Sequence, residues 1–447
     1  LTSTAARWMA ASAQAALTEP FIKISGPSSA GRFRRIDVAA FLSILREGDF
    51  LTRERIRLWT AAILFGYAAG IVFLVATAHG GSDYQGRPLG SDFSSFYAAG
   101  RLALNGQSPF DQALLHHMQQ DLFGKDTPYY SFSYPPIFLL IMAPLANLPY
   151  WAALAIWQGL GLSLYVTAML RLKHRYGAML GDATLYLAAA LAFATTFVNL
   201  THGQNGFLSA GLVALALSFL DENDGLAGIC FGLGAFKPQL GLLVPFALGA
   251  AGYWRGFASA AVCVIALSAL SVFAFGLPDW QGFLAATSFS QHAILDQDAV
   301  GYHKMTSVFA GMRLWGLPLD LSYLAQIAVA LAVVGSITWL WRSGAGMRLK
   351  GAALCLGMLL VTPFAFDYDM MVLAPAIALL AFEGLAKGFR PFERVLLAAL
   401  WCTPILTRNI ADYARVPLGV LLVLTAFAAL LARKGSAGIV RRTEIPA

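Results

Sequence analysis

The sequence predicts an all-α membrane protein that crosses the bilayer many times. Of its 447 residues 58% are hydrophobic and 12% are charged, and the mean hydropathy is +0.64. A soluble domain carries about 25% charged residues, so this chain has too little polar surface to cover a globule in water. The net charge of +7 predicts no nucleic-acid partner, because the basic residues form short clusters between apolar runs.

The apolar runs give the expected membrane spans. A crossing helix needs about 20 mostly apolar residues. The clear candidates are 58–78, 150–170, 183–200, 204–220, 255–276, 321–341, 351–366, 369–385, 394–410 and 415–432. The segment 225–252 is broken by Lys237-Pro238 and is either one tilted helix or two short helices. The segment 135–149 is short for a crossing, so about ten to thirteen spans are expected.

The positions of Lys and Arg predict the orientation. Short basic loops favour the cytoplasmic side of a membrane. Basic clusters include Arg53, Arg171, Arg342, Lys387 and Arg433. Placing them in the cytoplasm puts the loops 79–134 and 277–320 outside, together with nearly all polar residues of chemical interest. Whether 135–149 crosses stays open, because a full crossing would move the Arg171 cluster outside.

The domain organisation follows from these spans. We expect a cytoplasmic N-terminal extension over 1–57, a transmembrane domain over 58–434 and a cytoplasmic tail over 435–447. Arg32, Arg34 and Arg35 in the extension indicate either contact with anionic lipid or a solvated basic tail. Residues 1–20 lack a basic region followed by a compact apolar core, so no cleavable signal peptide is expected.

The first outer loop carries a carboxylate at the start of a predicted helix. Apolar residues at 93, 96, 97 and 104 follow Asp92 at helical spacing, and Asn105-Gly106 ends the pattern. The spacing predicts an amphipathic helix that lies along the outer interface. Asp92 is either the N-cap of this helix or an acid with a chemical role, since Asp is a favoured capping residue.

Lys237 is a second candidate for a functional role. It lies among small and apolar residues just before Pro238. An unpaired ammonium at bilayer depth costs about 3 kcal/mol, so such a lysine is functional or snorkels to the surface. Near the outer boundary its natural partner is an anion, and a lipid phosphate is the obvious one.

Other polar segments have both a chemical and a plain interpretation. The turn 201–206 contains Gln204 and Asn205, whose amides suit sugar hydroxyls but also suit a simple Gly-rich turn. His303 and Lys304 in the second outer loop suit a phosphate, or form a solvated loop. Phe366-Asp367-Tyr368-Asp369 resembles a metal-binding pair of carboxylates. We expect no metal, since the pair directly enters a span, and the four cysteines lie in apolar stretches without CxxC spacing.

Several motifs resemble glycosyltransferase family 87, whose members are membrane enzymes of the GT-C class. They occur in the family's order between about residues 88 and 370. The motifs are Asp92-Phe93, Tyr97-Ala98-Ala99-Gly100, Gly106-Gln107-Ser108-Pro109-Phe110-Asp111, Tyr134-Pro135-Pro136, Gly203-Gln204-Asn205 and Gly232-Leu233-Gly234-Ala235-Phe236-Lys237-Pro238. The family includes mannosyltransferases that depend on polyprenyl-phosphate-mannose.

The resemblance implies a GT-C-type helical bundle in which Asp92 acts as general base in an inverting transfer. The donor would be a polyprenyl-phosphate sugar, with mannose as the expected hexose, and the acceptor a lipid or glycan. No cofactor is expected beyond this lipid-linked co-substrate. The candidate donor-phosphate ligands are Lys237, His303, Arg101 and Lys304, and the candidate sugar or acceptor ligands are Tyr97, Tyr134, Gln204 and Asn205.

The expected location is the cytoplasmic membrane, with the active site on its outer face. Two other functions stay open. A transporter or flippase of a polyprenyl-linked glycan would spread polar residues along a path to both faces. A non-catalytic assembly subunit would not need an intact Asp92.

Overall fold

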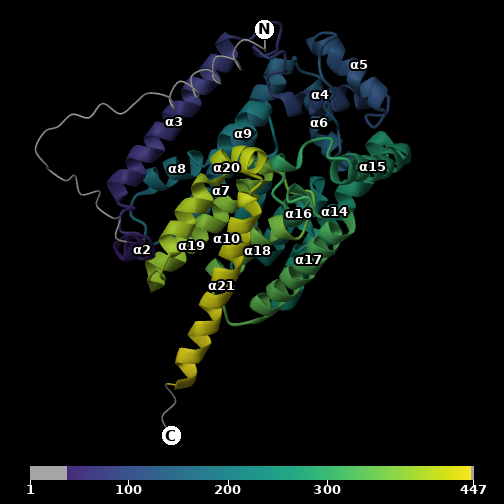
Figure 1. The fold of residues 1–447 in the computed structure, drawn as a ribbon. Helices are drawn as coiled ribbons and strands as arrows, with labels where there is room; N and C mark the ends of the chain where they lie inside the picture. Colours follow the sequence, from purple (N-terminus) through teal and green to yellow (C-terminus); the bar gives the residue numbers. More distant parts are fainter. Residues whose placement is uncertain (1–37, 444–447) are drawn as a thin grey trace, which may run out of the picture. The chain divides into compact units, whose positions relative to one another are not determined.

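A computed structural model describes residues 38–443, which are helical and contain no β-strand (Figure 1). The chain divides into two units, residues 1–43 and 44–447. Of the first unit only the beginning of helix α2 (Val38–Glu47) is described. Arg32, Arg34 and Arg35, for which we expected either contact with anionic lipid or a solvated basic tail, lie outside the described residues. The other helices of the described residues belong to the second unit.

Within the described residues, five helices are long and apolar enough to cross a membrane, or six if one bent pair counts as a span. The five are α3 (Arg53–Ala76), α7 (Tyr150–Tyr176), α14 (Trp254–Phe275), α17 (Leu319–Arg342) and η5 with α19 (Asp367–Lys387). The pair α8 (Ala183–Leu191) and α9 (Ala194–His202) is bent by 54°. An all-helical, multi-pass membrane protein is therefore confirmed.

The number of long spans is lower than the ten to thirteen expected. Several apolar segments form shorter helices, namely α10 (Gly206–Phe219), α11 (Asp224–Leu233), α13 (Val244–Ala251) and α18 (Met347–Leu360). The expected ranges near the C-terminus form α20 (Glu393–Ala414) and α21 (Leu418–Thr443). The second long loop holds α15 (Leu277–Ser290), the π-helix η3 (Gln291–Asp296), η4 (Tyr302–Lys304) and α16 (Val308–Leu314).

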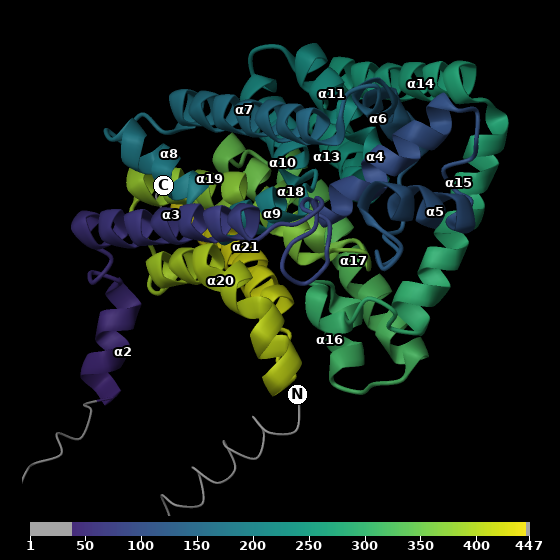
Figure 2. The same cartoon turned by 90° about the horizontal axis from the view of Figure 1, so that it is seen from above.

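Four arginine ion pairs lie at one end of the bundle, which we call the arginine end. They join Arg53 to Asp182, Arg171 to Glu222, Arg394 to Asp49 and Arg433 to Glu393, over N···O distances of 2.5 to 2.6 Å. The opposite end, the α4 end, carries α4 (Ser91–Leu104) and α5 (Gln112–Phe123) (Figure 1). Figure 2 shows the same bundle from above, with α4, α5 and α6 grouped beside one another.

The segment 136–149 does not cross the bundle. It forms η1 (Pro136–Phe138) and α6 (Leu139–Ala146), and an eight-residue helix is only about 12 Å long. The Tyr97 hydroxyl on α4 donates to the carbonyl of Leu148 at 2.8 Å, and Tyr150 donates to the carbonyl of Leu89 at 2.7 Å. Helix α7 therefore starts at the α4 end and carries Arg171 to the arginine end, which resolves the parity that the sequence left open.

The segment 225–252 is a hairpin rather than one tilted helix. Its helices are α11, η2 (Gly234–Phe236), α12 (Pro238–Gly241) and α13. After the return, the Tyr253 hydroxyl donates to Asp221 at 2.8 Å and Gly256 N–H donates to Asp224 at 3.2 Å. Both ends of the hairpin therefore meet at the arginine end. Lys237 lies at the break, where Pro238 can start a new helix because it needs no N–H bond there.

Helix α4 occupies the predicted range but is buried in the protein rather than exposed along the membrane surface. Phe93 and Phe96 are 0% and 1% exposed, and they pack on Trp157 of α7 and Phe138 of η1. Gly100 lies against the backbone of α6, where an added Cβ would come within 2.6 Å of the Met142 carbonyl oxygen. The small residues between the apolar positions therefore serve close helix packing.

Candidate active site

Asp92 lies in the first turn of α4 but does not cap it. The N-cap position is taken by Gly90, which has φ +71° and no side chain to accept a bond. The capping alternative for Asp92 is therefore wrong. Its carboxylate is 28% exposed, which leaves it accessible to a ligand while neighbouring residues of α4 are buried.

The carboxylate of Asp92 is held by the turn between α9 and α10. The Gln204 side-chain amide donates to Asp92 Oδ2 at 2.7 Å. His202 Nδ1 lies 4.0 Å from the same oxygen and 2.8 Å from the Ser91 hydroxyl. Among the described residues, none forms a hydrogen bond with Asp92 Oδ1. One carboxylate oxygen is thus fixed by a neutral amide, and the other remains available.

Gly203 lets this turn approach α4 closely. It has φ +67°, a conformation that glycine adopts readily, and an added Cβ would lie 2.5 Å from Phe93 Cβ. Trp157 holds the turn by donating its indole N–H to the Gly203 carbonyl at 2.9 Å. The turn 201–206, for which the sequence also allowed a simple Gly-rich turn, therefore fixes the position of Gln204.

The next residue of the turn binds the apex of the hairpin. Lys237 donates from Nζ to Asn205 Oδ1 at 2.8 Å and pairs with Asp369 Oδ1 at 2.5 Å. Its side chain is 3% exposed and that of Asp369 is 1% exposed. The ammonium also lies 4.8 Å from the Tyr368 ring centroid. Lys237 is therefore neutralised inside the protein, and not placed openly towards a lipid phosphate as the sequence suggested.

The two carboxylates of the Asp367-Tyr368-Asp369 motif point to different cations. Asp367 binds the Arg408 guanidinium at 2.5 and 3.1 Å, whereas Asp369 binds Lys237. Across residues 38–443, no group of three or more His, Cys, Asp or Glu side chains is placed to hold a metal ion. The motif supplies counter-charges to two basic residues.

Lys304 is a candidate phosphate ligand of the site, and Arg87 lies in the same electrostatic environment. Its half-buried ammonium forms no hydrogen bond or ion pair with the described residues. Burial and the charge of Arg408 lower the pKa of Lys304, while the negative charges of Asp367 and Asp92 act against this shift. Lys304, Arg408 and Asp92 therefore share one electrostatic environment at the α4 end. Arg408 was missed in the sequence, where it lies inside an apolar range.

Three further residues that the sequence predicted as ligands, Tyr134, His303 and Tyr97, have the following contacts. Tyr134 lies close to Gln204 and Asn205, and its ring centroid is 5.9 Å from the Lys237 ammonium. His303 lies 3.9 Å from Asp412 and is 29% exposed. The Tyr97 hydroxyl donates a hydrogen bond to the Leu148 carbonyl, and the residue is 5% exposed.

Arg101 does not reach the site. It lies nine residues after Asp92 on the same helix, which is about 13 Å along the axis. Its guanidinium contacts the carbonyl of Ala146 at 3.4 Å. The structure therefore separates Arg101 from the other residues that we expected around a donor phosphate.

The fold and this site define a multi-pass membrane protein in which the accessible carboxylate of Asp92 lies among cations and amides at one end of a helical bundle. The family model of glycosyltransferase family 87 matches residues 132–363, just over half of the chain. The chain belongs to this family and is a membrane glycosyltransferase. No curated protein and no solved structure matches it.

The matched range is shorter than the resemblance in motifs suggested. It includes Tyr134, Gln204, Asn205, Lys237 and Lys304. Asp92, Asp367, Asp369 and Arg408 lie outside it. The contact between Gln204 and Asp92 therefore connects the matched part of the chain to the candidate base.

Proposed function

We propose that the protein transfers a hexose, mannose by the family resemblance, from a polyprenyl-phosphate sugar to a hydroxyl of a lipid or glycan acceptor. The transfer inverts the anomeric centre, and Asp92 is the general base. One observation carries this proposal. The Asp92 carboxylate is partly exposed and does not cap its helix, and Gln204 holds one of its oxygens.

In the proposed reaction the acceptor oxygen forms a bond to the anomeric carbon while the bond from that carbon to the phosphate oxygen breaks. The acceptor proton moves to Asp92, and polyprenyl phosphate leaves as an anion. A phosphate leaving group needs no proton, so one carboxylate is enough, with a contribution of about 10²–10⁴-fold. Fixed cations stabilise the charge that develops on the phosphate.

Lys304 is the best-placed ligand for that phosphate. Its ammonium has no partner among the described residues and lies near Arg408, whereas Lys237 is already bound by Asp369. A charge-assisted hydrogen bond from such a free cation is stronger than one between neutral groups. In this proposal Lys237 holds the turn through Asn205, and Lys304 contacts the donor.

Asn205 and Tyr134 are suited to sugar hydroxyls. Asn205 is 1% exposed, and its Nδ2 forms no hydrogen bond of good geometry among the described residues, although the Tyr134 hydroxyl lies close to it. A buried donor without a partner costs about 1–3 kcal/mol, which a ligand oxygen can recover. Tyr134 lies beside this amide. The Asn205 amide and Tyr134 support a binding site for sugar hydroxyls next to Asp92.

The proposed location is the outer face of the cytoplasmic membrane. The basic residues of the arginine end favour the cytoplasmic side. The α4 end, which carries Asp92, then faces outward. No metal or other cofactor is included in the proposal.

The test is a transfer assay with purified protein and synthetic polyprenyl-phosphate mannose. We expect sugar transfer from this donor with inversion, no transfer from a nucleotide sugar, and unchanged turnover after treatment with a chelator. Movement of a labelled polyprenyl-linked glycan across proteoliposomes without transfer would favour the flippase instead. Activity lost to the chelator would reopen Asp367 and Asp369 as metal ligands.

Replacing Lys304 is expected to weaken donor binding. Lys304→Gln should raise the KM for the donor by about tenfold, the order expected when a charged hydrogen bond is lost. Arg101→Gln is the matched control, because Arg101 lies remote from Asp92. The measurement is the donor concentration dependence of transfer. An unchanged KM in Lys304→Gln together with a raised KM in Arg101→Gln would contradict the phosphate site proposed here.

A further inference from the structure

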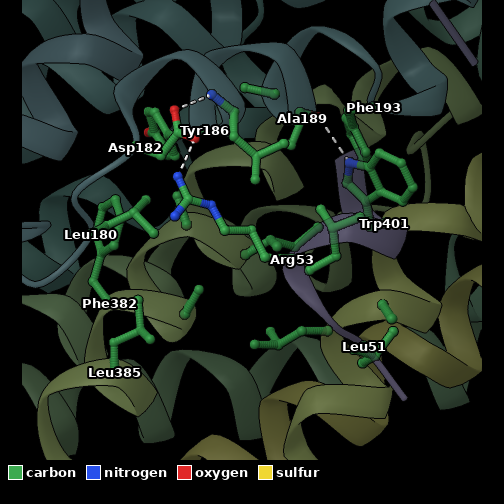
Figure 3. A pocket seen from close by; sticks show the side chains of 18 of the residues that line it. Leu51, Arg53, Leu180, Asp182, Tyr186, Ala189, Phe193, Phe382, Leu385 and Trp401 are labelled. Atoms are coloured by element: carbon green, nitrogen blue, oxygen red, sulfur yellow. Dashed lines mark hydrogen bonds and ion pairs between the residues drawn. The ribbon is translucent and has the colours of Figure 1, made fainter. Parts of the chain in front are cut away.

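A large apolar cavity lies away from Asp92, towards the arginine end. Its volume is about 980 Å³, at the upper end of the range of ordinary ligand pockets. The walls come from the first turns of α3, from α8 and from the facing sides of α19 and α20. Figure 3 shows Phe193, Trp401, Phe382 and Leu385 around it, with Arg53 and Asp182 at its charged side.

The cavity has the depth of one membrane leaflet. On α19 its lining runs from Ala374 to Leu385, which is about 16 Å along a helix. The hydrocarbon core of a bilayer is about 30 Å thick, so one leaflet measures about 15 Å. Two of the walls belong to helices long and apolar enough to cross a membrane, α3 and α19. A hydrocarbon chain from the surrounding lipid therefore matches both the length and the polarity of the space.

The mouth of the cavity is basic. Arg53 and Arg394 line it, and Arg57 lies one turn beyond Arg53. Arg53 and Arg57 share one carboxylate, Asp182, and their side chains are 60% and 63% exposed. Glu54 lies in the same turn and interacts with both arginines, so Asp182 and Glu54 face three exposed arginines, Arg53, Arg55 and Arg57, and a net positive charge remains at the surface. This charge is complementary to an anionic headgroup placed at the level of the arginine end.

We propose that this cavity is a binding site for one anionic phospholipid of the leaflet at the arginine end. A hydrocarbon chain fills the space between α3, α8, α19 and α20, and the phosphate lies against Arg53 and Arg57. The site is separate from the candidate active site. Along α19 and η5, Leu385 is sixteen residues from Asp369, or about 24 Å, so a headgroup at this mouth cannot reach Asp92.

The occupant can be tested by counting retained lipid. Purified protein is exchanged into mixed micelles that contain phosphatidylglycerol and phosphatidylcholine of equal chain length. Native mass spectrometry then gives the lipids bound to each chain. We expect one phosphatidylglycerol to be retained in preference to phosphatidylcholine. Removing Arg53 and Arg57 together should lower this retention by about fivefold for each arginine, the order found for basic residues near anionic lipid.

Two controls separate the chain site from the headgroup site. Ala381→Trp and Ala398→Trp place bulk into the cavity from α19 and α20 and should abolish retention, whereas Ala62→Trp on the exposed side of α3 should not. Arg55→Ala is the matched basic control, since Arg55 is exposed and does not line the cavity. Unchanged retention in a monodisperse Ala381→Trp or Ala398→Trp variant would overturn the proposal. Equal retention of both phospholipids, or displacement by polyprenyl phosphate at equal concentration, would also overturn it.

Discussion

Asp92→Asn is expected to lower sugar transfer by at least about 100-fold while donor binding and folding remain. The amide keeps the shape of the carboxylate and can still accept the bond from Gln204, but it cannot take the proton of the acceptor hydroxyl. General bases contribute about 10²–10⁴-fold to such steps, which sets the expected loss. The measurement is turnover from polyprenyl-phosphate mannose, with donor binding measured separately.

Asp111→Asn is the control for this variant. Asp111 caps α5 by accepting from the backbone N–H groups of Ala113 and Leu114, and Asn caps nearly as well as Asp. Activity and stability should therefore stay close to those of the unchanged protein. If Asp92→Asn turned over at the normal rate, Asp92 would be excluded as the base, and the family's chemistry would need another acceptor of the proton.

Lys237→Met is expected to reduce the amount of folded protein strongly. Removing one member of a buried ion pair leaves the other charge without a partner and costs about 3–5 kcal/mol. Lys237 and Asp369 are 3% and 1% exposed, so water cannot compensate for the loss. The double variant Lys237→Met with Asp369→Asn should recover stability relative to either single change, because no buried charge then remains. The measurements are the yield of monodisperse protein and the midpoint of thermal unfolding.

This double-variant comparison also separates two roles of Lys237. If Lys237 binds the donor phosphate, Lys237→Met should fold normally and show a raised donor KM, and adding Asp369→Asn should bring no recovery. Arg101→Met is the control for loss of a surface charge, since Arg101 makes one long contact with a carbonyl. Normal folding of Lys237→Met would contradict the structural role and restore the interpretation drawn from sequence.

Local patterns predicted much of the fold. The apolar spacing after Asp92 placed a helix over 93–104, and α4 covers Ser91–Leu104. The break at Lys237-Pro238 was visible because proline interrupts helical hydrogen bonding. The pattern could not show that α4 is buried, since the face that would meet lipid at the membrane surface meets α6 and α7 instead. Hydrophobicity alone does not distinguish lipid from protein as the neighbour.

The sequence did not predict which residues far apart in the chain form ion pairs. The sequence predicted an anionic partner for Lys237. That partner is Asp369, which lies in a segment that resembles a metal-binding motif. Arg408 was overlooked because it falls at the end of an apolar range, and its partner Asp367 lies 41 residues away in the sequence. Arg101 could have been excluded earlier, because nine helical residues separate it from Asp92 by about 13 Å.

The ion pair at the apex of the hairpin also has a consequence for biogenesis. The ribosome completes the hairpin long before it makes η5, and α14, α17 and α18 are synthesised in between. During that interval the Lys237 ammonium has no acidic partner, and a lone charge is poorly tolerated in lipid. We therefore expect the hairpin to reach its final depth only after Asp369 has been made. The Asn205 contact that Lys237 makes beside Gln204 and Asp92 would then be completed late, and assembly of a working site would depend on synthesis of the last fifth of the chain.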